Sequence, residues 1–361
     1  MNSKIFLSPP HMSGKELDYI KEVFESNYIA PVGEFIERFE QSICDFTKAK
    51  YTCAVVNGTS AIHLALRILG IKNGDKVLAS TFTFIGSITP ILFQNAEPVF
   101  IDSDESWNID PGLVEEAAKK EKPKALIVTH LYGQMAKIED LLFLSRKYGF
   151  YLIEDAAEAL GATYKKKHAG TFGDFGIYSF NGNKIITTSS GGMLVSSNGE
   201  WIRQARFLST QAKENYPWYE HETFGYNYRM SNVLAAIGVA QMEVLEERVK
   251  RKREIFDIYK RELGDIADFM PEIENSRGNR WLTTLIFKDK NPLKVSETLK
   301  KHNIESRPLW KPMHTQPVFR NAKAYINGAS EALFKKGLCL PSGTALKDEQ
   351  IIEICRIIRK G

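Results

Sequence analysis

Cysteine is scarce in this sequence, and neither a long apolar run nor a marked excess of one charge is present. The four cysteines (Cys44, Cys53, Cys339 and Cys355) lack close metal-ligand spacing, so we expect buried thiols in a reducing, cytoplasmic setting and no metal site. No run approaches the roughly 20 apolar residues of a membrane span, and the first residues lack the apolar core of a signal peptide. The net charge of +4 is small beside 48 basic and 44 acidic residues, which gives no reason to expect a nucleic-acid partner.

The length and composition fit a chain with more than one domain. It has 361 residues, and its apolar content of 43% is enough for a full core. We predict a large domain with an N-terminal arm over residues 1–245 and a smaller α+β domain over residues 246–361. Helical spacing of apolar residues predicts helices over 15–26 and 34–49, joined by an extended connector before Pro31.

Short apolar segments alternate with helical segments after residue 50. We predict strands at 51–56, 76–80, 98–102, 125–130 and 151–154, and helices between them such as 111–119 and 138–147. This alternation predicts an α/β fold, a mostly parallel sheet with helices on both faces. Ligands of such sheets bind beyond the carboxyl ends of the strands, so the residues at those ends are candidate site residues.

The first such end is a glycine-containing turn. Gly58 and Thr59 follow the strand at 51–56 and begin an apolar helix that stops at Gly70. Free backbone N–H groups and a hydroxyl at a helix N-terminus suit an anion. An ordinary helix cap explains the turn equally well.

One lysine lies in a loop between two strand-like segments. Lys184 follows an Asn-Gly-Asn run, which favours an irregular backbone, and hydroxyl residues surround it, among them Ser179. A lysine amine can condense with the aldehyde of pyridoxal phosphate (PLP), and hydroxyls suit its phosphate. The alternative is a solvated surface lysine.

Two further residues suit a flat, cationic ring. Asp155 ends a strand 29 residues before Lys184 and could pair with a protonated ring nitrogen, although it could also cap a helix. Phe84 follows another strand and could stack on the ring, or it could belong to the core.

In this order, the motifs resemble those of the DegT/DnrJ/EryC1/StrS family of sugar aminotransferases, which are PLP enzymes of the aspartate-aminotransferase fold type. The resemblance extends over nearly the whole chain. Its motifs are FE at 39–40, NGTSA at 57–61, TF at 83–84, EDAAEALG at 154–161, SFNGNK at 179–184, TT at 187–188, GGM at 191–193 and GYNYRM at 225–230.

The resemblance implies a role for each matching residue. Lys184 would bind the PLP aldehyde covalently and later move a proton between cofactor and sugar. Asp155 would pair with the ring nitrogen and Phe84 would stack on the ring, and the phosphate would bind Gly58, Thr59 and Ser179.

The resemblance also implies a homodimer, in which Asn227 reaches the phosphate of the partner's cofactor. Two positions depart from the family pattern. Glu158 stands where Gln or His often contacts the ring hydroxyl, so that contact is in question. Ser189 and Ser190 replace a frequent Gly-Glu pair, with no consequence that the sequence reveals.

The last third of the chain predicts a long helix over 233–262, a strand over 281–287 and helices over 293–302 and 348–359. Between them, the segment RPLWKPMH at 307–314 is stiffened by two prolines. Its Arg, Lys and Trp offer charge and stacking for a nucleotide diphosphate, although a structured surface loop is equally compatible.

For the substrate, we expect the mouth of the site to be walled by the extended connector and the proline-rich segment, with Arg229 arriving from the partner. The residues concerned are Asn27, Tyr28, Ile29, Ala30, Lys311 and His314.

The opening FLSPPHM and the RPLWKPMH segment are most similar to enzymes of the bacillosamine branch. They imply transfer of the amino group of glutamate to C4 of a UDP-linked 4-keto-6-deoxy-N-acetylhexosamine, for bacterial glycan synthesis. The alternatives are a dTDP- or GDP-linked 4-keto-6-deoxy sugar, a family dehydratase, and a non-catalytic binding protein on the same scaffold. The dehydratases lack the lysine that is present here, and binding proteins of this kind often carry a membrane anchor.

Overall fold

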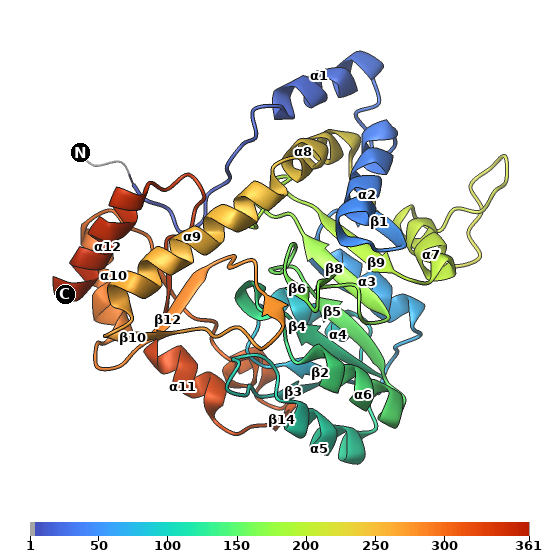
Figure 1. Ribbon diagram of the computed structural model, residues 1–361. Helices are drawn as coiled ribbons and strands as arrows, with labels where there is room; N and C mark the ends of the chain where they lie inside the picture. The colour runs from blue at the N-terminus through green and yellow to red at the C-terminus, as the bar shows by residue number, and fades with distance from the viewer. Residues whose placement is uncertain (1–3, 361) are drawn as a thin grey trace.

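The computed structural model describes residues 4–360, which build a large mixed sheet and a smaller antiparallel one (Figure 1). The large sheet has the strand order β1-β9-β8-β5-β4-β2-β3-β14, and β9 is antiparallel to both of its neighbours while the other pairs are parallel. Its strands are β1 (Tyr51–Val55), β2 (Lys76–Ser80), β3 (Glu97–Ile101), β4 (Ala125–Thr129), β5 (Tyr151–Asp155), β8 (Phe175–Ser179), β9 (Gly192–Ser196) and β14 (Lys323–Tyr325).

Helices cover both faces of this sheet. Neighbouring strand residues alternate between two cores: Cys53 and Val55 pack in one, and Ala54 packs in the other. Strands buried on both faces are apolar throughout, which explains the uninterrupted apolar runs in the sequence. One face carries α2 (Glu34–Thr47), α5 (Pro111–Glu121), α6 (Ile138–Tyr148) and α8 (Asn232–Met242); the other carries α3 (Gly58–Ile68), α4 (Thr89–Phe93) and α7 (Gly199–Ser209).

The C-terminal part of the chain has its own core around an antiparallel sheet. Its strand order is β10-β12-β15-β13, formed by β10 (Ala267–Phe269), β12 (Thr283–Phe287), β13 (Arg307–Pro308) and β15 (Gly337–Leu340). Its helices are α9 (Leu245–Leu263), α10 (Pro292–Lys301), α11 (Ala329–Lys336) and α12 (Asp348–Lys360). The predicted domain boundary at 245/246 therefore falls at the start of α9, although β14 crosses back to the edge of the large sheet.

The N-terminal arm packs on the C-terminal part of the chain. The amide of Ile5 donates to the carbonyl of Asn303 at 2.9 Å, and Ser342 donates its amide to the carbonyl of Leu7 at 2.7 Å. The arm then leads to α1 (Glu16–Ser26), which contacts α8. The arm thus spans both parts of the fold.

The long helix predicted over 233–262 is wrong, because the structure has two helices there. α8 ends at Met242 and α9 begins at Leu245. The backbone of Val244, between them, is not helical (φ −111°, ψ 5°). α8 packs in the core of the large sheet, whereas α9 begins in that core with Leu245 and Val249 and continues into the core of the smaller sheet from Ile255. Apolar spacing does not reveal the break, because both helices keep a helical period.

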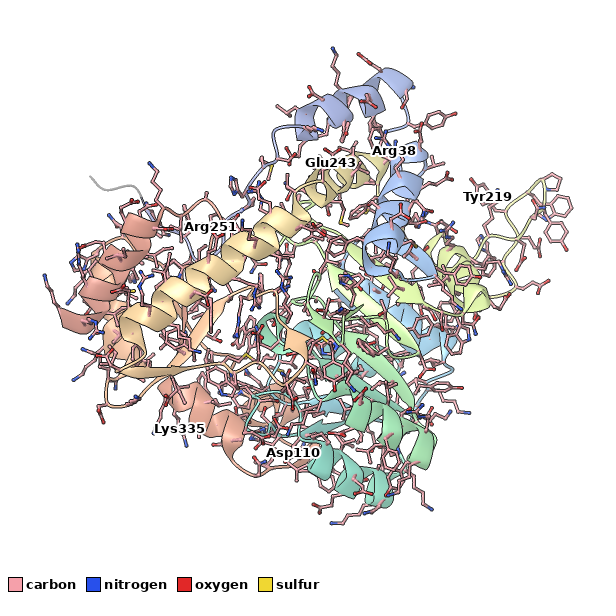
Figure 2. All side chains as sticks on the ribbon, viewed as in Figure 1. Arg38, Asp110, Tyr219, Glu243, Arg251 and Lys335 are labelled. Carbon is pink, nitrogen blue, oxygen red and sulfur yellow. The ribbon has the colours of Figure 1, made fainter. Side chains whose placement is uncertain are left out.

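The remaining elements are short. They are β6 (Thr163–Tyr164), β7 (Lys167–His168) and β11 (Ser276–Arg277), which form a small sheet, and the 3₁₀ turns at Ile85–Ser87, Leu131–Gly133, Met313–Thr315 and Pro317–Phe319. A loop with Tyr219 near its tip projects from the body of the molecule (Figure 2). In the part of the chain that the structure describes, no helix combines the length and the apolar character needed to cross a bilayer.

Candidate active site

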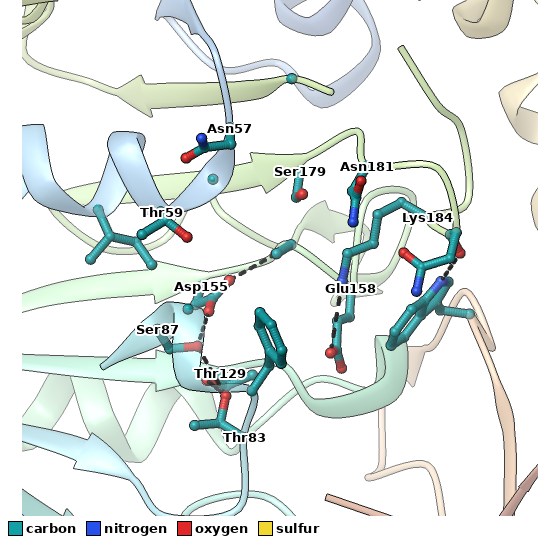
Figure 3. A pocket seen from close by; sticks show the side chains of 18 of the residues that line it. Asn57, Thr59, Thr83, Ser87, Thr129, Asp155, Glu158, Ser179, Asn181 and Lys184 are labelled. Carbon is teal, nitrogen blue, oxygen red and sulfur yellow. Dashed lines mark hydrogen bonds and ion pairs between the residues drawn. The ribbon is translucent and has the colours of Figure 1, made fainter. Parts of the chain in front are cut away.

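A cleft of about 280 Å³ opens at the carboxyl ends of the large sheet's parallel strands, where such sheets bind ligands (Figure 3). The structure brings seven of the predicted residues together there. They are Gly58, Thr59, Phe84, Asp155, Glu158, Ser179 and Lys184. Residues more than 100 positions apart thus meet at one edge of the sheet, as the alternating strand pattern predicts.

The N-terminus of α3 forms one wall of the cleft. The side chain of Asn57 caps the helix by accepting a hydrogen bond from the amide of Ser60 at 2.8 Å. Glycines let the backbone approach closely here: a Cβ on Gly192 would lie 2.6 Å from the amide nitrogen of Gly58. The wall therefore presents the first turn of a helix, with the hydroxyl-bearing Thr59 and Ser179 beside it, as an anion requires.

Asp155 lies at the floor of the cleft and is buried. Its Oδ2 accepts a 2.5 Å hydrogen bond from the hydroxyl of Ser87, and its Oδ1 accepts one from the amide of Ala157 at 3.0 Å. The hydroxyl of Thr83 links Ser87 to Thr129 (Figure 3). Within residues 4–360, no lysine or arginine nitrogen lies within 4 Å of this carboxylate, so a cationic ligand nitrogen would find an oriented acceptor.

Lys184 faces a second buried acid. Its Nζ lies 3.8 Å from Oε1 of Glu158 and 4.1 Å from the ring centroid of Trp281 (Figure 3). Burial lowers the pKa of Lys184, while the negative charges of Glu158 and Asp155 act in the opposite direction. The lowered pKa increases the share of neutral, nucleophilic amine, which condensation with an aldehyde requires.

Glu158 accepts a hydrogen bond at 2.7 Å from the amide of Tyr132. Burial raises its pKa to about 7, although the charge of Lys184 and this hydrogen bond favour the carboxylate. The group can therefore gain or lose a proton near neutral pH, next to the amine of Lys184.

We expect Glu158→Gln to stabilise the cofactor-free protein more at pH 8 than at pH 5. The pKa of about 7 in the folded state exceeds the ordinary value of 4.5, so the folded protein binds more protons between these pH values and its free energy of unfolding falls as the pH rises. Glutamine cannot ionise, and its carbonyl can still accept the Tyr132 amide. Urea unfolding should show an advantage over the unaltered protein that grows by up to about 3 kcal/mol toward pH 8.

The matched control is Glu297→Gln, at an exposed position of α10. Its free energy of unfolding should differ from that of the unaltered protein by the same small amount at both pH values. An equal effect of Glu158→Gln at pH 5 and pH 8 would contradict a raised pKa for Glu158.

Aromatic side chains shape the mouth of the cleft. Phe84 is half exposed, and its ring centroid lies 5.4 Å from that of Trp310. Trp281 is buried against Lys184. The sequence does not identify Trp281 or Ser87 as site residues, because neither lies in a motif. Trp310 belongs to the proline-rich segment, and the sequence suggests it as a stacking residue. Only the fold shows that it lines the cleft.

A second cavity of about 500 Å³ adjoins the cleft. Asn183, Trp281 and Trp310 line both. The N-terminal arm and the region of β13 form most of its other walls, and Tyr132, Leu282 and Cys339 complete them. The arm contributes Phe6, Leu7, Ser8, Pro9 and Pro10, and the β13 region contributes Glu305, Arg307 and Pro308. The two cavities therefore adjoin at Asn183, Trp281 and Trp310, a smaller inner one that contains Lys184 and a larger, mostly apolar outer one.

The residues of the inner cleft fit PLP. The oriented buried carboxylate of Asp155 can accept from a ring N–H, the first turn of α3 can bind the phosphate, and Lys184 can bind the aldehyde. Phe84 lines the same cleft and offers a ring face.

Eight of the predicted residues line neither cavity of their own subunit, and five of these lie in the connector after α1 or after the projecting loop. Asn27 ends α1 in left-handed geometry (φ 61°), and Tyr28, Ile29 and Ala30 after it are exposed. Asn227 is also exposed, after the projecting loop. None of the five lines either cavity.

Arg229, predicted to reach the substrate of the partner subunit, is bound within its own chain, and its contact with the substrate stays a prediction. Its guanidinium is paired with Glu40 at 2.6 Å within the same chain and donates to the carbonyl of Ala54 at 3.0 Å, and its side chain is only 12% exposed. Freeing it for a ligand would leave the buried carboxylate of Glu40 with a weaker ion-pair network. Within its own chain, Arg229 therefore also has a structural role as the partner of Glu40.

His314 and Lys311 line neither cavity of their own chain, and their contacts with the substrate stay predictions. His314 points to Thr81, with 2.7 Å between its Nδ1 and the threonine hydroxyl, and its Nε2 lies 3.4 Å from Glu331. Lys311 is exposed and lines neither cavity. In this segment Arg307 and Trp310 face the site instead.

The two serines that depart from the family pattern differ in conformation. Ser189 is left-handed (φ 68°), where glycine carries no Cβ penalty and an L side chain costs about 1–2 kcal/mol. Ser190 lines the cleft, and its hydroxyl donates to the carbonyl of Val56 at 2.7 Å. Ser190 thus ties the loop after Lys184 to the turn before α3.

Comparison with known proteins agrees with this geometry. The model of the DegT/DnrJ/EryC1/StrS aminotransferase family matches residues 10–359. The chain is 50% identical to a Bacillus subtilis (strain 168) protein named "Putative pyridoxal phosphate-dependent aminotransferase EpsN", over 98% of this chain and 95% of that protein. It is 37% identical to GDP-perosamine synthase of Escherichia coli O157:H7, over 97% and 96%.

The fold is shared with solved structures. The aminotransferase TlmJ from Streptoalloteichus hindustanus superimposes with a TM-score of 0.93 at 26% identity, over 99% of this chain and 98% of that one.

Proposed function

The chain belongs to the DegT/DnrJ/EryC1/StrS family of PLP-dependent sugar aminotransferases, and from this we propose that it transfers the amino group of glutamate to C4 of a UDP-linked 4-keto-6-deoxy-N-acetylhexosamine. That it acts on nucleotide-linked sugars, with PLP as cofactor, follows from the family and its relatives. The choice of UDP, of the acetamido sugar, of C4 and of glutamate is the proposal.

The observation that carries the proposal is the second cavity. Residues from FLSPPHM and from RPLWKPMH, the two segments whose resemblance suggests this sugar, face each other across it. The cavity shares Asn183, Trp281 and Trp310 with the cleft that holds Lys184, and we infer that one ligand places a keto carbon at the amine and its remaining atoms in the outer cavity. Arg307 lies at the outer end, where its exposed guanidinium is paired with Glu305 at 3.0 Å, and a diphosphate would compete with that carboxylate for it.

A second candidate is a GDP-linked 4-keto-6-deoxy sugar. The relative from Escherichia coli is named for a GDP-linked product, whereas the name of the more similar Bacillus subtilis relative states no sugar. The Escherichia coli relative favours a GDP-linked sugar, and the segments around the second cavity favour the UDP-acetamido sugar.

The residues of the cleft would have separate roles in this reaction. When bound, PLP supplies an aldehyde that condenses with amines and a ring that accepts the electron pair of the adjacent carbon. Lys184 would provide the amine that holds the aldehyde and would move a proton between the two reacting carbons. Asp155, held by Ser87, would keep the ring nitrogen protonated. Trp281 covers one side of the amine, and Trp310 lines the same cleft.

We expect the UDP-acetamido sugar to have the highest kcat/KM in a parallel assay of UDP-acetamido, dTDP and GDP 4-keto-6-deoxy sugars with glutamate. A pocket built to hydrogen-bond the acetamido group should discriminate against a hydroxyl there by about 1–3 kcal/mol, because a buried polar group would lose its partner. A higher value for the GDP or dTDP sugar would refute the choice of sugar and leave the aminotransferase activity intact.

We also propose a homodimer in which Asn227 completes the partner's phosphate site. Asn227 cannot serve its own cleft, which it does not line. Exposed aromatic residues precede it in the projecting loop, and a second copy would cover them; they are Tyr216, Trp218, Tyr219 and Phe224. The exposed connector with Tyr28 and Ile29 is a further surface for that copy.

A further inference from the structure

A buried lysine on α9 is outside the chemistry described above. Lys252 is 2% exposed, and within residues 4–360 no carboxylate lies within 4 Å of its Nζ. Its Nζ donates to the hydroxyl of Ser8 at 3.0 Å and to the carbonyl of Trp281 at 2.8 Å. Burial lowers the pKa of Lys252 to about 7. Burying an amine without an acid opposes folding, so these two bonds are the main compensation that the structure offers.

Both partners of Lys252 meet again at the loop that carries Lys184. The hydroxyl of Ser8 donates to the carbonyl of Asn183 at 3.1 Å, and the indole Nε1 of Trp281 donates to the same carbonyl at 2.7 Å. Lys252, Ser8, Trp281 and Asn183 therefore form a closed ring of hydrogen bonds, which we call the arm ring.

The arm ring joins parts of the chain that are far apart in sequence. Ser8 belongs to the N-terminal arm, Trp281 lies two residues before β12 of the C-terminal sheet, and Asn183 directly precedes Lys184. Ser8, Asn183 and Trp281 also line the second cavity. Moving any one of them would alter the outer cavity and the backbone that holds Lys184.

We propose that Lys252 is a positioning residue that fixes the N-terminal arm and Trp281 against the Lys184 loop and so sets the shape of the outer cavity. The hydrogen bonds on which this rests exist in the protein alone. Its consequence for turnover rests on the proposed function, because the outer cavity is assigned there to the sugar nucleotide.

The first test is hydrogen exchange of the cofactor-free protein carrying Lys252→Met, which keeps the length of the side chain and removes its donors. Peptides over residues 4–12 and 180–187 should exchange about tenfold faster, while β4 should not change, because the loss of one or two hydrogen bonds opens these segments locally. Lys250→Met, at an exposed position two residues away on α9, is the control and should leave all three segments unchanged.

The second test separates positioning from general destabilisation. In turnover, Lys252→Met should raise the KM for the sugar nucleotide about tenfold and the KM for glutamate less than about twofold, because only the larger ligand needs the outer cavity. Unchanged exchange in both segments, or an equal rise of both KM values, would overturn the proposal.

If Lys252→Met does not fold, Ser8→Ala tests the arm side of the ring. It should raise the exchange rates of the two segments and the KM for the sugar nucleotide, by smaller factors. If neither the exchange rates nor this KM changed, the proposal would be overturned. If no nucleotide sugar is turned over, the proposed function fails while the exchange result still decides the role of Lys252.

Discussion

Lys184→Ala protein should lose multiple-turnover activity by a factor of at least about 1,000, because it removes both the nucleophilic amine and the group that moves the proton. The buried carboxylate of Asp155 and the first turn of α3 remain, so the variant should still bind PLP, now without a covalent bond. Activity with glutamate and the preferred nucleotide sugar is the measurement, with equilibrium dialysis of PLP beside it.

Lys335→Ala, at an exposed position of α11, is the control for that loss and should behave like the unaltered protein. Near-normal turnover by Lys184→Ala would rule out Lys184 as the reactive amine. Loss of both turnover and PLP binding would instead indicate that the amine is needed to retain the cofactor.

Lys184→Ala and Asn227→Asp proteins, each inactive alone, should regain activity when unfolded, mixed and refolded together. Asn227→Asp sets a carboxylate against a phosphate, so each parent dimer has two defective sites. A mixed dimer has one site with an intact Lys184 and an intact Asn227 from the partner. Random pairing should therefore restore about a quarter of the unaltered activity, since half of the dimers are mixed and half of their sites are intact.

Each variant refolded alone is the control and should stay inactive. Full inactivity of the mixture would show that Asn227 does not act across a subunit boundary. Activity of a monomer in sedimentation would exclude the shared site altogether.

The sequence predicts β1, β2, β3, β4 and β5 to within one residue, because strands buried on both faces appear as nearly continuous apolar runs between turns, but it does not predict β14. It predicts the inner cleft for a related reason. Gly58, Asp155 and Ser179 each lie where a strand ends or a helix begins, and a parallel sheet brings such ends to one edge.

Tertiary pairing is what the sequence does not show. Arg229 and His314 have the chemistry of ligand-binding residues, and in the fold they pair with Glu40 and Thr81, partners that nothing local marks. The break between α8 and α9 likewise depends on tertiary packing, because α9 passes from the core of the large sheet into that of the smaller sheet. Trp281 becomes a site residue only because the C-terminal part of the chain packs over the Lys184 loop.

The central claim is that Lys184 holds PLP in the cleft, and reductive trapping tests it most directly. The purified protein, loaded with PLP, is reduced with borohydride, digested and analysed by mass spectrometry. The account predicts loss of the yellow colour and one phosphopyridoxyl group, attached to the peptide that contains Lys184. A label on any other lysine, or none on this peptide from a protein that binds PLP, would contradict it.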